Sequence, residues 1–323
     1  MNISNVEYQV VEVYDLSVTV PDSFVVNENK TCRGHGEAKL YMGSKEHMRS
    51  FYTDNPLAAG FEVKCIVLKN DLLQYMQTIK HEYFHPSIIY RGLKKKSLAH
   101  LWEHRYEMIQ NLPDVLEFQI CDQVQIEGSR GYVKYVSRKK DNGYEIIRNV
   151  ALPFVSYLSV MKLRETGTGR FMFYWRLFTD FTQMAEQQYW AKNYGKRKSL
   201  ASTRRRNGQV QYRQGLFEQF KHCPFSKIDD MRILVASHIK PWAICNKDEQ
   251  TDISNGMLLS PLYDKLFDRG FITFEDDGSL KISEWLSKDN QDRIDFTYDM
   301  NDLQLTAERK TYLEYHRNNV FKS

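Results

Sequence analysis

The sequence predicts an α+β protein of two domains, with a mixed α/β domain at the N-terminus and a smaller C-terminal domain. A length of 323 residues is enough for two separate cores. Strand-like and helix-like apolar patterns alternate through 1–190, and a basic, loop-like segment then occupies 191–211. The remainder, 212–323, contains strand, long loop, strand and helix patterns in that order. We therefore expect the domain limits at these three ranges.

Hydrophobic periodicity predicts the elements of the N-terminal domain, whose fold resembles none that we recognise. Strands are expected where residues alternate or β-branched and aromatic residues cluster, at Tyr8–Val20, Glu62–Leu68, Leu116–Glu127, Gly131–Ser137, Tyr144–Val150 and Phe171–Phe181. Helices are expected at Asn70–His85, Ser97–Asn111 and Pro153–Arg164. The Asp-Asn-Gly triplet at 141–143 predicts a hairpin between the two strands that flank it.

The C-terminal domain is expected to contain short elements. Strands are predicted at Arg232–His238, Gly256–Leu259, Phe271–Phe274 and Ser279–Ile282. Helices are predicted to start at Leu216–Phe220 and to span Pro261–Arg269 and Thr306–Asn319. A proline at the first position of the middle helix supports that start, because its missing N–H would be unpaired there in any case.

Charge is concentrated in one place. The net charge of +4 permits a nucleic-acid partner without requiring one. Eight basic residues and no acidic residue lie between Lys192 and Arg213. This run is either a solvated linker or an arm for phosphates, since each bound phosphate releases counterions. The arginines expected to contact DNA there are Arg204, Arg205, Arg206 and Arg213.

The five cysteines are widely spaced and form no C-x-x-C pair, so neither a disulfide framework nor a zinc ribbon is predicted. The N-terminus lacks the basic start and apolar run of a secretory signal. No apolar stretch approaches the ~20 residues of a membrane helix. We expect a cytoplasmic protein with reduced thiols and no membrane partner.

Four polar residues stand at spacings that a hairpin crossed by a helix can bring together. His238 ends a predicted strand, and Asn255 opens the next strand 17 residues later. Asp264 and Asp268, four residues apart, share one face of the following helix. A neutral imidazole suits activation of water, and two carboxylates offer oxygen ligands for Mg²⁺ or Mn²⁺. Phosphodiester hydrolysis needs both functions.

Each of these residues also has an ordinary structural interpretation when it is taken alone. His238 is then a hydrogen-bonded core histidine, and Asp264 is an acidic residue favoured near a helix N-terminus. Asp268 is then the partner of Arg269 or Arg232. Because these residues occur together in this order, we favour a catalytic site over separate structural roles for each of them.

Three segments, ASHIKPW at 236–242, NGMLLSP at 255–261 and DKLFDRG at 264–270, resemble the HNH endonuclease family, in particular bacterial restriction-type members. The similarity extends from about Tyr212 to Phe321. It implies a ββα-metal fold with His238 as the general base and Asn255 as the middle Asn. Asp264 then replaces the last His of many members, and Asp268 is a further metal ligand.

Two departures from the family pattern affect the expected metal chemistry. Ser237 stands where some members carry a metal-binding Asp or His, so it is a candidate third ligand beside Asp264 and Asp268. Cys223 stands alone where many members carry cysteine pairs, so no structural zinc is expected. The resemblance implies one Mg²⁺ or Mn²⁺ per site. Lys240 and Arg269, next to the site, are either phosphate contacts or ordinary surface charges.

The function implied is cleavage of double-stranded DNA by a restriction or phage-defence nuclease, with a possible homodimer that cuts both strands. The N-terminal domain is then expected to supply specificity or sensing, because contacts to phosphates do not specify sequence. One alternative is a DNA-binding protein with an inactive HNH fold.

A second alternative is a zinc-dependent hydrolase. His81 and His85 match H-E-x-x-H, with Glu82 as the base. Pro86 argues against this motif because it ends the helix directly after the second His. A third ligand would also be needed, for which only Glu103 or His104 is conceivable.

Overall fold

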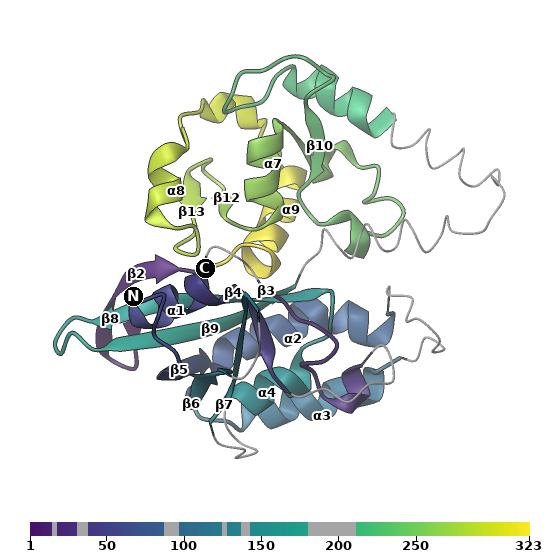
Figure 1. The fold of residues 1–323 in the computed structure, drawn as a ribbon. Coiled ribbons are helices and arrows are strands. Elements are labelled where there is room, and N and C mark those ends of the chain that lie inside the picture. Colours follow the sequence, from purple (N-terminus) through teal and green to yellow (C-terminus); the bar gives the residue numbers. More distant parts are fainter. Residues whose placement is uncertain (15–17, 31–37, 87–96, 125–127, 137–142, 180–210) are drawn as a thin grey trace. The chain divides into compact units, whose positions relative to one another are not determined.

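The computed structural model describes residues 1–14, 18–30, 38–86, 97–124, 128–136, 143–179 and 211–323 (Figure 1). It contains helices and sheets, which confirms the α+β class. The chain divides into two compact units, Met1–Asp180 and Phe181–Ser323. The limits expected at 190 and 212 stay a prediction, and Arg204, Arg205 and Arg206 lie outside the described residues.

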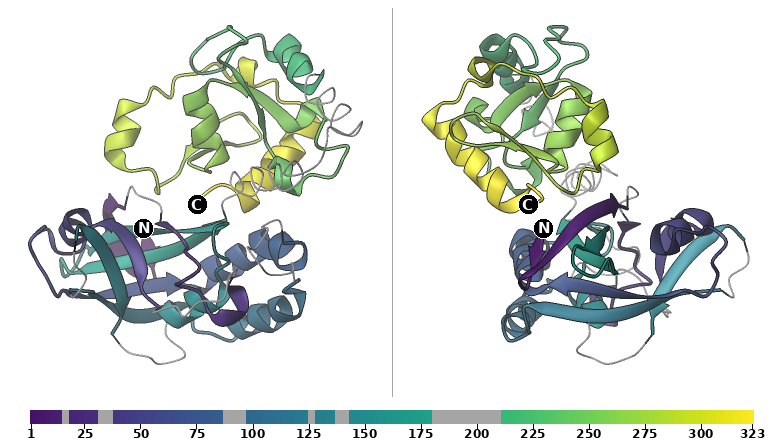
Figure 2. Two further views of the ribbon diagram at one scale, coloured as in Figure 1. Left: turned by 45° about the vertical axis from the view of Figure 1, so that its right-hand side comes forward. Right: turned by 90° about the vertical axis from the view of Figure 1, so that its left-hand side faces the viewer.

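One mixed sheet organises unit 1, Met1–Asp180, and twists strongly along its strand order (Figure 2). Its order is β1-β2-β8-β9-β5-β6-β7-β4, with β3 beside β8. Described neighbours pair antiparallel except β5 and β9, which run parallel. The strands span Asn2–Ile3 (β1), Val6–Val13 (β2), Val18–Thr19 (β3), Leu40–Ser44 (β4), Glu62–Leu68 (β5), Val115–Asp122 (β6), Arg130–Tyr135 (β7), Ser156–Glu165 (β8) and Phe171–Thr179 (β9).

Helices cover parts of this sheet. They span Lys45–Thr53 (α1), Lys69–Phe84 (α2), Ala99–Gln110 (α3) and Gly143–Val150 (α4). Helix α2 packs on β9 and β5, α3 packs on α2, and α1 lies against β4 and β7. An aromatic core forms where Trp175 of β9 meets Phe118 of β6 and Tyr144 of α4. All three side chains are buried, so this cluster fixes the sheet to its helices.

Two predictions in unit 1 are wrong. The predicted strand Tyr144–Val150 is helix α4, and the predicted helix Pro153–Arg164 is largely strand β8. Strand β8 is buried on both faces, so its apolar residues do not alternate, and its buried polar residues Ser156, Ser159 and Lys162 stand at every third position. This spacing fits a helix as well as a buried strand. The hairpin predicted at 141–143 also fails at its described end, because Gly143 begins a helix.

Unit 2, Phe181–Ser323, is built from short elements, as predicted. Residues 211–220 are helical. The other elements span Val235–His238 (β10), Gly256–Leu259 (β11), Pro261–Asp268 (α7), Ile272–Phe274 (β12), Leu280–Ile282 (β13), Lys288–Arg293 (α8) and Ala307–Asn319 (α9). Strands β10 and β11 pair antiparallel, and α7 packs against both (Figure 1). None of the helices described in either unit is long and apolar enough to cross a membrane.

Sequence determines where α7 begins and ends. Ser260 is its N-cap residue and Pro261 occupies the first turn. Gly270, just beyond the helix, has a φ of +68°, and a Cβ there would lie 2.0 Å from the Val320 carbonyl oxygen. Only glycine fits this position. Helix α7 is therefore fixed in length and held against the chain that follows α9.

Candidate active site

Strand β10 ends with two adjacent residues, Ser237 and His238, that have different surroundings. Successive side chains of a strand point to opposite faces. The Ser237 hydroxyl interacts with the carboxyls of Asp264 and Asp268 on α7. The His238 ring packs instead against Tyr212, from helical residues 211–220. The site therefore has a carboxylate side and an imidazole side.

On the imidazole side, His238 is held in one orientation. Its ring stacks on Tyr212 with centroids 4.4 Å apart and planes 17° from parallel. Its Nε2 lies 3.2 Å from the Gln250 carbonyl oxygen. A carbonyl only accepts, so Nε2 carries the hydrogen and Nδ1 keeps the lone pair. Burial lowers the pKa of His238, which leaves the imidazole neutral at pH 7.

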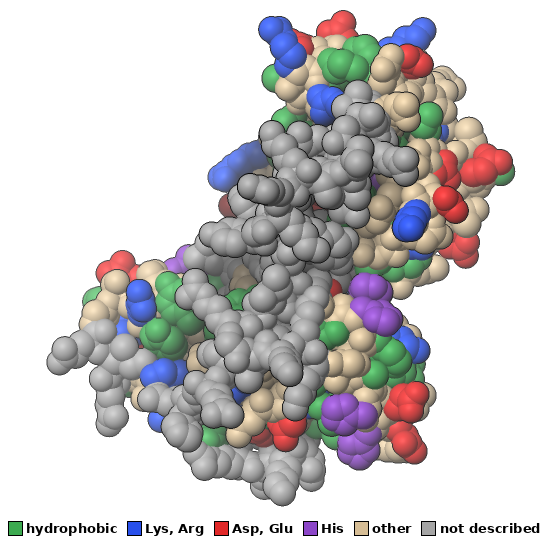
Figure 3. All heavy atoms as spheres, turned by 90° about the vertical axis from the view of Figure 1, so that its right-hand side faces the viewer, with side chains coloured by type: hydrophobic (Ala, Val, Ile, Leu, Met, Phe, Trp, Pro, Cys, Tyr) green, Lys and Arg blue, Asp and Glu red, His purple; other side chains and the backbone are tan. Residues whose placement is uncertain are grey.

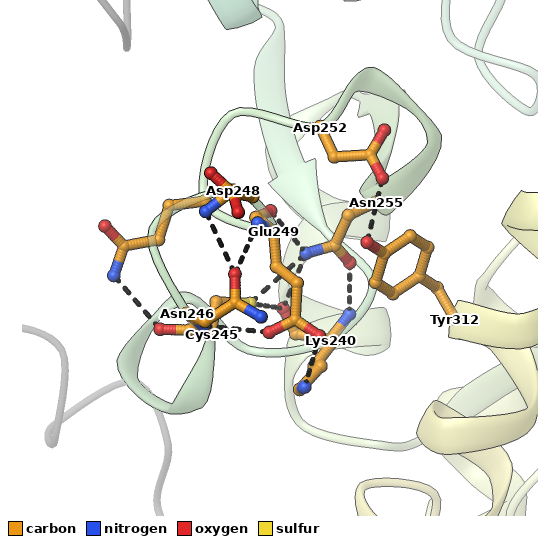
Figure 4. Close-up of polar contacts among 9 residues, drawn as sticks. Lys240, Cys245, Asn246, Asp248, Glu249, Asp252, Asn255 and Tyr312 are labelled. Carbon is orange, nitrogen blue, oxygen red and sulfur yellow. Dashed lines mark hydrogen bonds and ion pairs between the residues drawn. The ribbon is translucent and has the colours of Figure 1, made fainter.

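Asn255 fastens the loop that holds His238. The side chain is fully buried, and its Oδ1 accepts from the Lys240 backbone N–H at 2.8 Å (Figure 4). Its Nδ2 donates to the Glu249 carbonyl at 3.0 Å. Gln250, the next residue, presents the carbonyl that contacts His238. Asn255 therefore anchors the loop whose Gln250 carbonyl contacts His238.

On the carboxylate side, Asp264 and Asp268 lie one turn apart in α7. Burial and the neighbouring charge of Asp264 raise the pKa of Asp268 to about 7. Burial also raises the pKa of Asp264. The nearby Ser237 hydroxyl lowers both pKa values, although its buried oxygen forms no hydrogen bond of normal geometry within the described part of the chain. Two acids and an unsatisfied oxygen are thus enclosed together.

These donors fit a hard divalent cation. All three offer oxygen, which Mg²⁺ and Mn²⁺ prefer, whereas zinc favours nitrogen and sulfur. A cation would relieve the repulsion that raises the pKa of Asp268 and would satisfy the Ser237 oxygen. Among the described residues no group of three or more His, Cys, Asp and Glu could hold a metal ion. The fit therefore rests on two carboxylates and a hydroxyl, a set to which Mg²⁺ commonly adds water.

A scan of protein families matches residues 223–275 to the HNH endonucleases. The C-terminal part of the chain carries an HNH endonuclease domain. The matched range includes β10, β11 and α7, so the resemblance seen in the sequence is confirmed there. No curated protein matches the chain. HNH nucleases generally use a divalent metal ion, in agreement with the oxygen donors of the carboxylate side.

The cations expected to contact DNA in this HNH domain already have protein partners. Lys240 Nζ lies 2.7 Å from Glu249 Oε1, and Arg213 donates to the Leu234 carbonyl at 2.9 Å. Arg269 lowers the pKa of Asp268 through its charge. Residues 211–323 carry 15 basic and 19 acidic side chains. Figure 3 shows both signs interspersed over the described surface in that view.

Sequence reasoning missed the residues of α9 that support Asn255. Arg309 is fully buried and donates to the carbonyls of Ile253 and Gly256, each at 3.1 Å. These carbonyls flank Asn255, which lies between them in the chain. Tyr312 donates to Asp252 at 2.8 Å (Figure 4). Both residues stand outside the matched range, and polar residues on a helix give no sign of such a role.

Tyr212 also had no assigned role. A Cβ at position 256 would lie 2.2 Å from the Tyr212 hydroxyl, so Gly256 lets this ring cross β11 to reach His238. The close approach of this ring therefore requires glycine directly after Asn255.

The H-E-x-x-H segment gains no support as a zinc site. Helix α2 ends at Phe84, and the rings of His81 and His85 lie 5.3 Å apart. Glu82, in the last turn of this helix, is buried. The described residues include no third ligand that would complete a metal-binding group.

Proposed function

We propose that this chain is a metal-dependent endonuclease that hydrolyses phosphodiester bonds of double-stranded DNA through its HNH domain. The observation that carries the proposal is His238, which is neutral, oriented by Gln250 and one residue from the carboxylate side. A base at His238 and cation-binding oxygens at Ser237, Asp264 and Asp268 would provide the two functions that the reaction needs.

In this mechanism His238 Nδ1 accepts a proton from the water that attacks phosphorus. The Gln250 carbonyl, which accepts from Nε2, stabilises the imidazolium that forms. Asn255 keeps that carbonyl in place. Asp264, Asp268 and Ser237 would hold Mg²⁺ or Mn²⁺, which supplies charge stabilisation at the phosphate and the leaving oxygen.

We further propose that the protein serves as a restriction or phage-defence nuclease, with unit 1 as the part that selects DNA. The motive is physical: a site that contacts phosphates cuts any DNA, so selection has to come from elsewhere. A homodimer would provide two sites for the two strands.

Plasmid cleavage in Mg²⁺ or Mn²⁺ tests the activity. We expect His238→Ala to lower the rate by about 100- to 10,000-fold, the usual loss for a general base. His222→Ala is a matched control in the same domain, because this half-exposed histidine pairs with Asp302 instead. Cleavage that survives His238→Ala would refute the assigned base. DNA binding without cleavage at any metal concentration would favour the inactive, binding-only alternative.

A further inference from the structure

In unit 1 an aromatic pair lies on the outer face of strands β4 and β7. Tyr41 of β4 pairs in register with Tyr132 of β7, and their ring centroids lie 5.4 Å apart. Tyr41 keeps 43% of its surface exposed, and Tyr132 is half-buried. The pair therefore presents ring surface to solvent at a sheet edge, where α2 and α3 do not lie: these helices pack on β9, β5 and each other.

Strand β7 places a cation on each side of this pair. Its outward residues are Arg130, Tyr132 and Lys134, and both cations are exposed. At ~3.3 Å per residue, each cation stands about 7 Å from the tyrosine along the strand. The inward Val133 is fully buried. The spacing of aromatic and cationic groups is therefore set by a strand that is anchored on its other face.

The opposite face of β7 explains why this strand is held firmly. A Cβ at Gly131 would lie 3.0 Å from the Met48 sulfur and 3.1 Å from the Ser44 carbonyl oxygen. The backbone thus approaches α1 and β4 more closely than a side chain would permit. A rigid strand is what a binding face needs, because its side chains lose little freedom on contact.

Three cations of this face lie beside the tyrosine pair. Lys39 Nζ lies 5.3 Å from the Tyr132 ring centroid, which adds a third cation to Arg130 and Lys134. Along the register, Lys134 is opposite Cys121, and Cys121 is opposite Glu62. This carboxylate of the same face therefore lies two strands from Lys134. An anionic ligand on the pair would meet the cations first.

We propose that this tyrosine–cation face, made of Lys39, Tyr41, Arg130, Tyr132 and Lys134, binds single-stranded DNA. Aromatic rings bind unpaired bases by stacking, and flanking cations bind the backbone. In a duplex the bases cover one another, so the rings would find no free base surface. The choice of DNA over RNA rests on the proposed nuclease function, while the stacking chemistry is independent of it.

Fluorescence anisotropy of the full chain with a labelled oligo-dT strand, in EDTA to prevent cleavage, tests the face. We expect Tyr132→Ala to weaken binding by about 5- to 150-fold, from ~1–3 kcal/mol per stacked base. Tyr132→Phe keeps the ring and should bind within about twofold of wild type. Tyr106→Ala is the matched control, because that half-buried ring stacks on Trp102 of α3, away from the face.

Salt dependence tests the cations separately. Arg130→Gln and Lys134→Gln should each reduce the slope of log affinity against log salt by about 0.7, the value for one phosphate of a single strand. The basic segment 191–211 is present in every variant, so its contribution cancels. Circular dichroism and thermal melting of Tyr41→Ala and Tyr132→Ala check that both variants keep their fold.

Three results would overturn the proposal: wild-type affinity in folded Tyr41→Ala and Tyr132→Ala, a loss in Tyr132→Phe equal to that in Tyr132→Ala, or equal weakening of duplex binding. Tighter binding of an RNA strand of the same length would overturn the assignment to DNA. Plasmid cleavage is scored separately. If strand binding is lost while cleavage stays intact, the result bears only on the proposal for this face. If cleavage is absent while strand binding depends on the rings, only the proposed nuclease function fails.

Discussion

The two sides of strand β10 differ in how complete they are. On the imidazole side, polar groups find partners within the protein: Nε2 of His238 meets the Gln250 carbonyl, and Asn255 bonds the loop on both sides. On the carboxylate side, Asp264 and Asp268 repel each other, and the Ser237 oxygen lacks a normal hydrogen bond among the described residues. One side is preorganised by the fold, and the other requires a proton or a cation.

This difference predicts opposite effects of mutation on stability. The folded protein binds a proton at Asp268 more tightly than the unfolded chain, because its pKa of about 7 exceeds the ordinary value. Stability from this group is therefore full below pH ~4 and declines as pH rises to about 7. At pH 8 the metal-free protein is destabilised by the full cost of keeping Asp268 ionised in its buried position. Asn255 causes no such destabilisation, because it is uncharged and fully hydrogen-bonded.

Among the variants that compare the two sides of β10, Asp268→Asn has the largest expected effect. We expect cleavage to fall by about 100- to 1,000-fold, as for loss of one stabilising group, while the metal-free protein melts at a higher temperature at pH 8. The gain should disappear at pH 4. Asn255→Ala is the comparison: it should also impair cleavage but destabilise the fold by about 1–3 kcal/mol, since buried partners lose their bonds. Thermal melting without metal at both pH values distinguishes the two. Destabilisation by Asp268→Asn at pH 8 would contradict the comparison.

The second effect concerns pH and metal. A carboxylate must lose its proton to bind Mg²⁺ or Mn²⁺, so apparent affinity should fall about tenfold per pH unit below 7 for each proton displaced. Cleavage at limiting metal should rise with pH to about 7 and then level, because above that pH Asp268 has lost its proton and the lowered pKa of His238 leaves the imidazole neutral. Titrations of cleavage against Mn²⁺ from pH 5.5 to 8.5 measure this. A profile independent of metal concentration would place the titration elsewhere.

The distance along the chain between residues explains which parts of the candidate site could be predicted from sequence. Asp264, Asp268 and His238 were predicted as site residues because short segments place them at fixed spacings in local elements, and β10, β11 and α7 formed where expected. Arg309 and Tyr312 were missed because they reach the site from α9, more than 50 residues beyond Asn255. Only tertiary packing brings them there.

Unit 1 shows where local sequence patterns fail to predict secondary structure. Strand β5 and helix α2 follow their local patterns closely, whereas β8, enclosed on both faces, loses the alternation that identifies a strand. The error at α4 has a related cause. Its β-branched residues favour a strand locally, and burial against Trp175 and Phe118 stabilises the helix instead.

The smallest expected effect tests whether α9 maintains the imidazole side. Arg309 donates to the carbonyls on both sides of Asn255, and burial lowers its pKa to about 10, so it stays charged near neutral pH. Arg309→Lys keeps a charge but loses the planar fork that reaches several oxygens. We expect kcat to fall several-fold with KM for DNA unchanged, because the loop and His238 shift while phosphate contacts remain.

Arg317→Lys is the matched control for this test. Arg317 lies in the same helix and bonds the Phe274 carbonyl and Asp276, remote from Asn255. Arg317→Lys should leave kcat unchanged and should change the melting temperature about as much as Arg309→Lys does. Parallel losses of kcat in both variants would show that α9 contributes only general stability. A loss of kcat confined to Arg309→Lys would show that the imidazole side of the HNH domain depends on a residue outside the matched range 223–275.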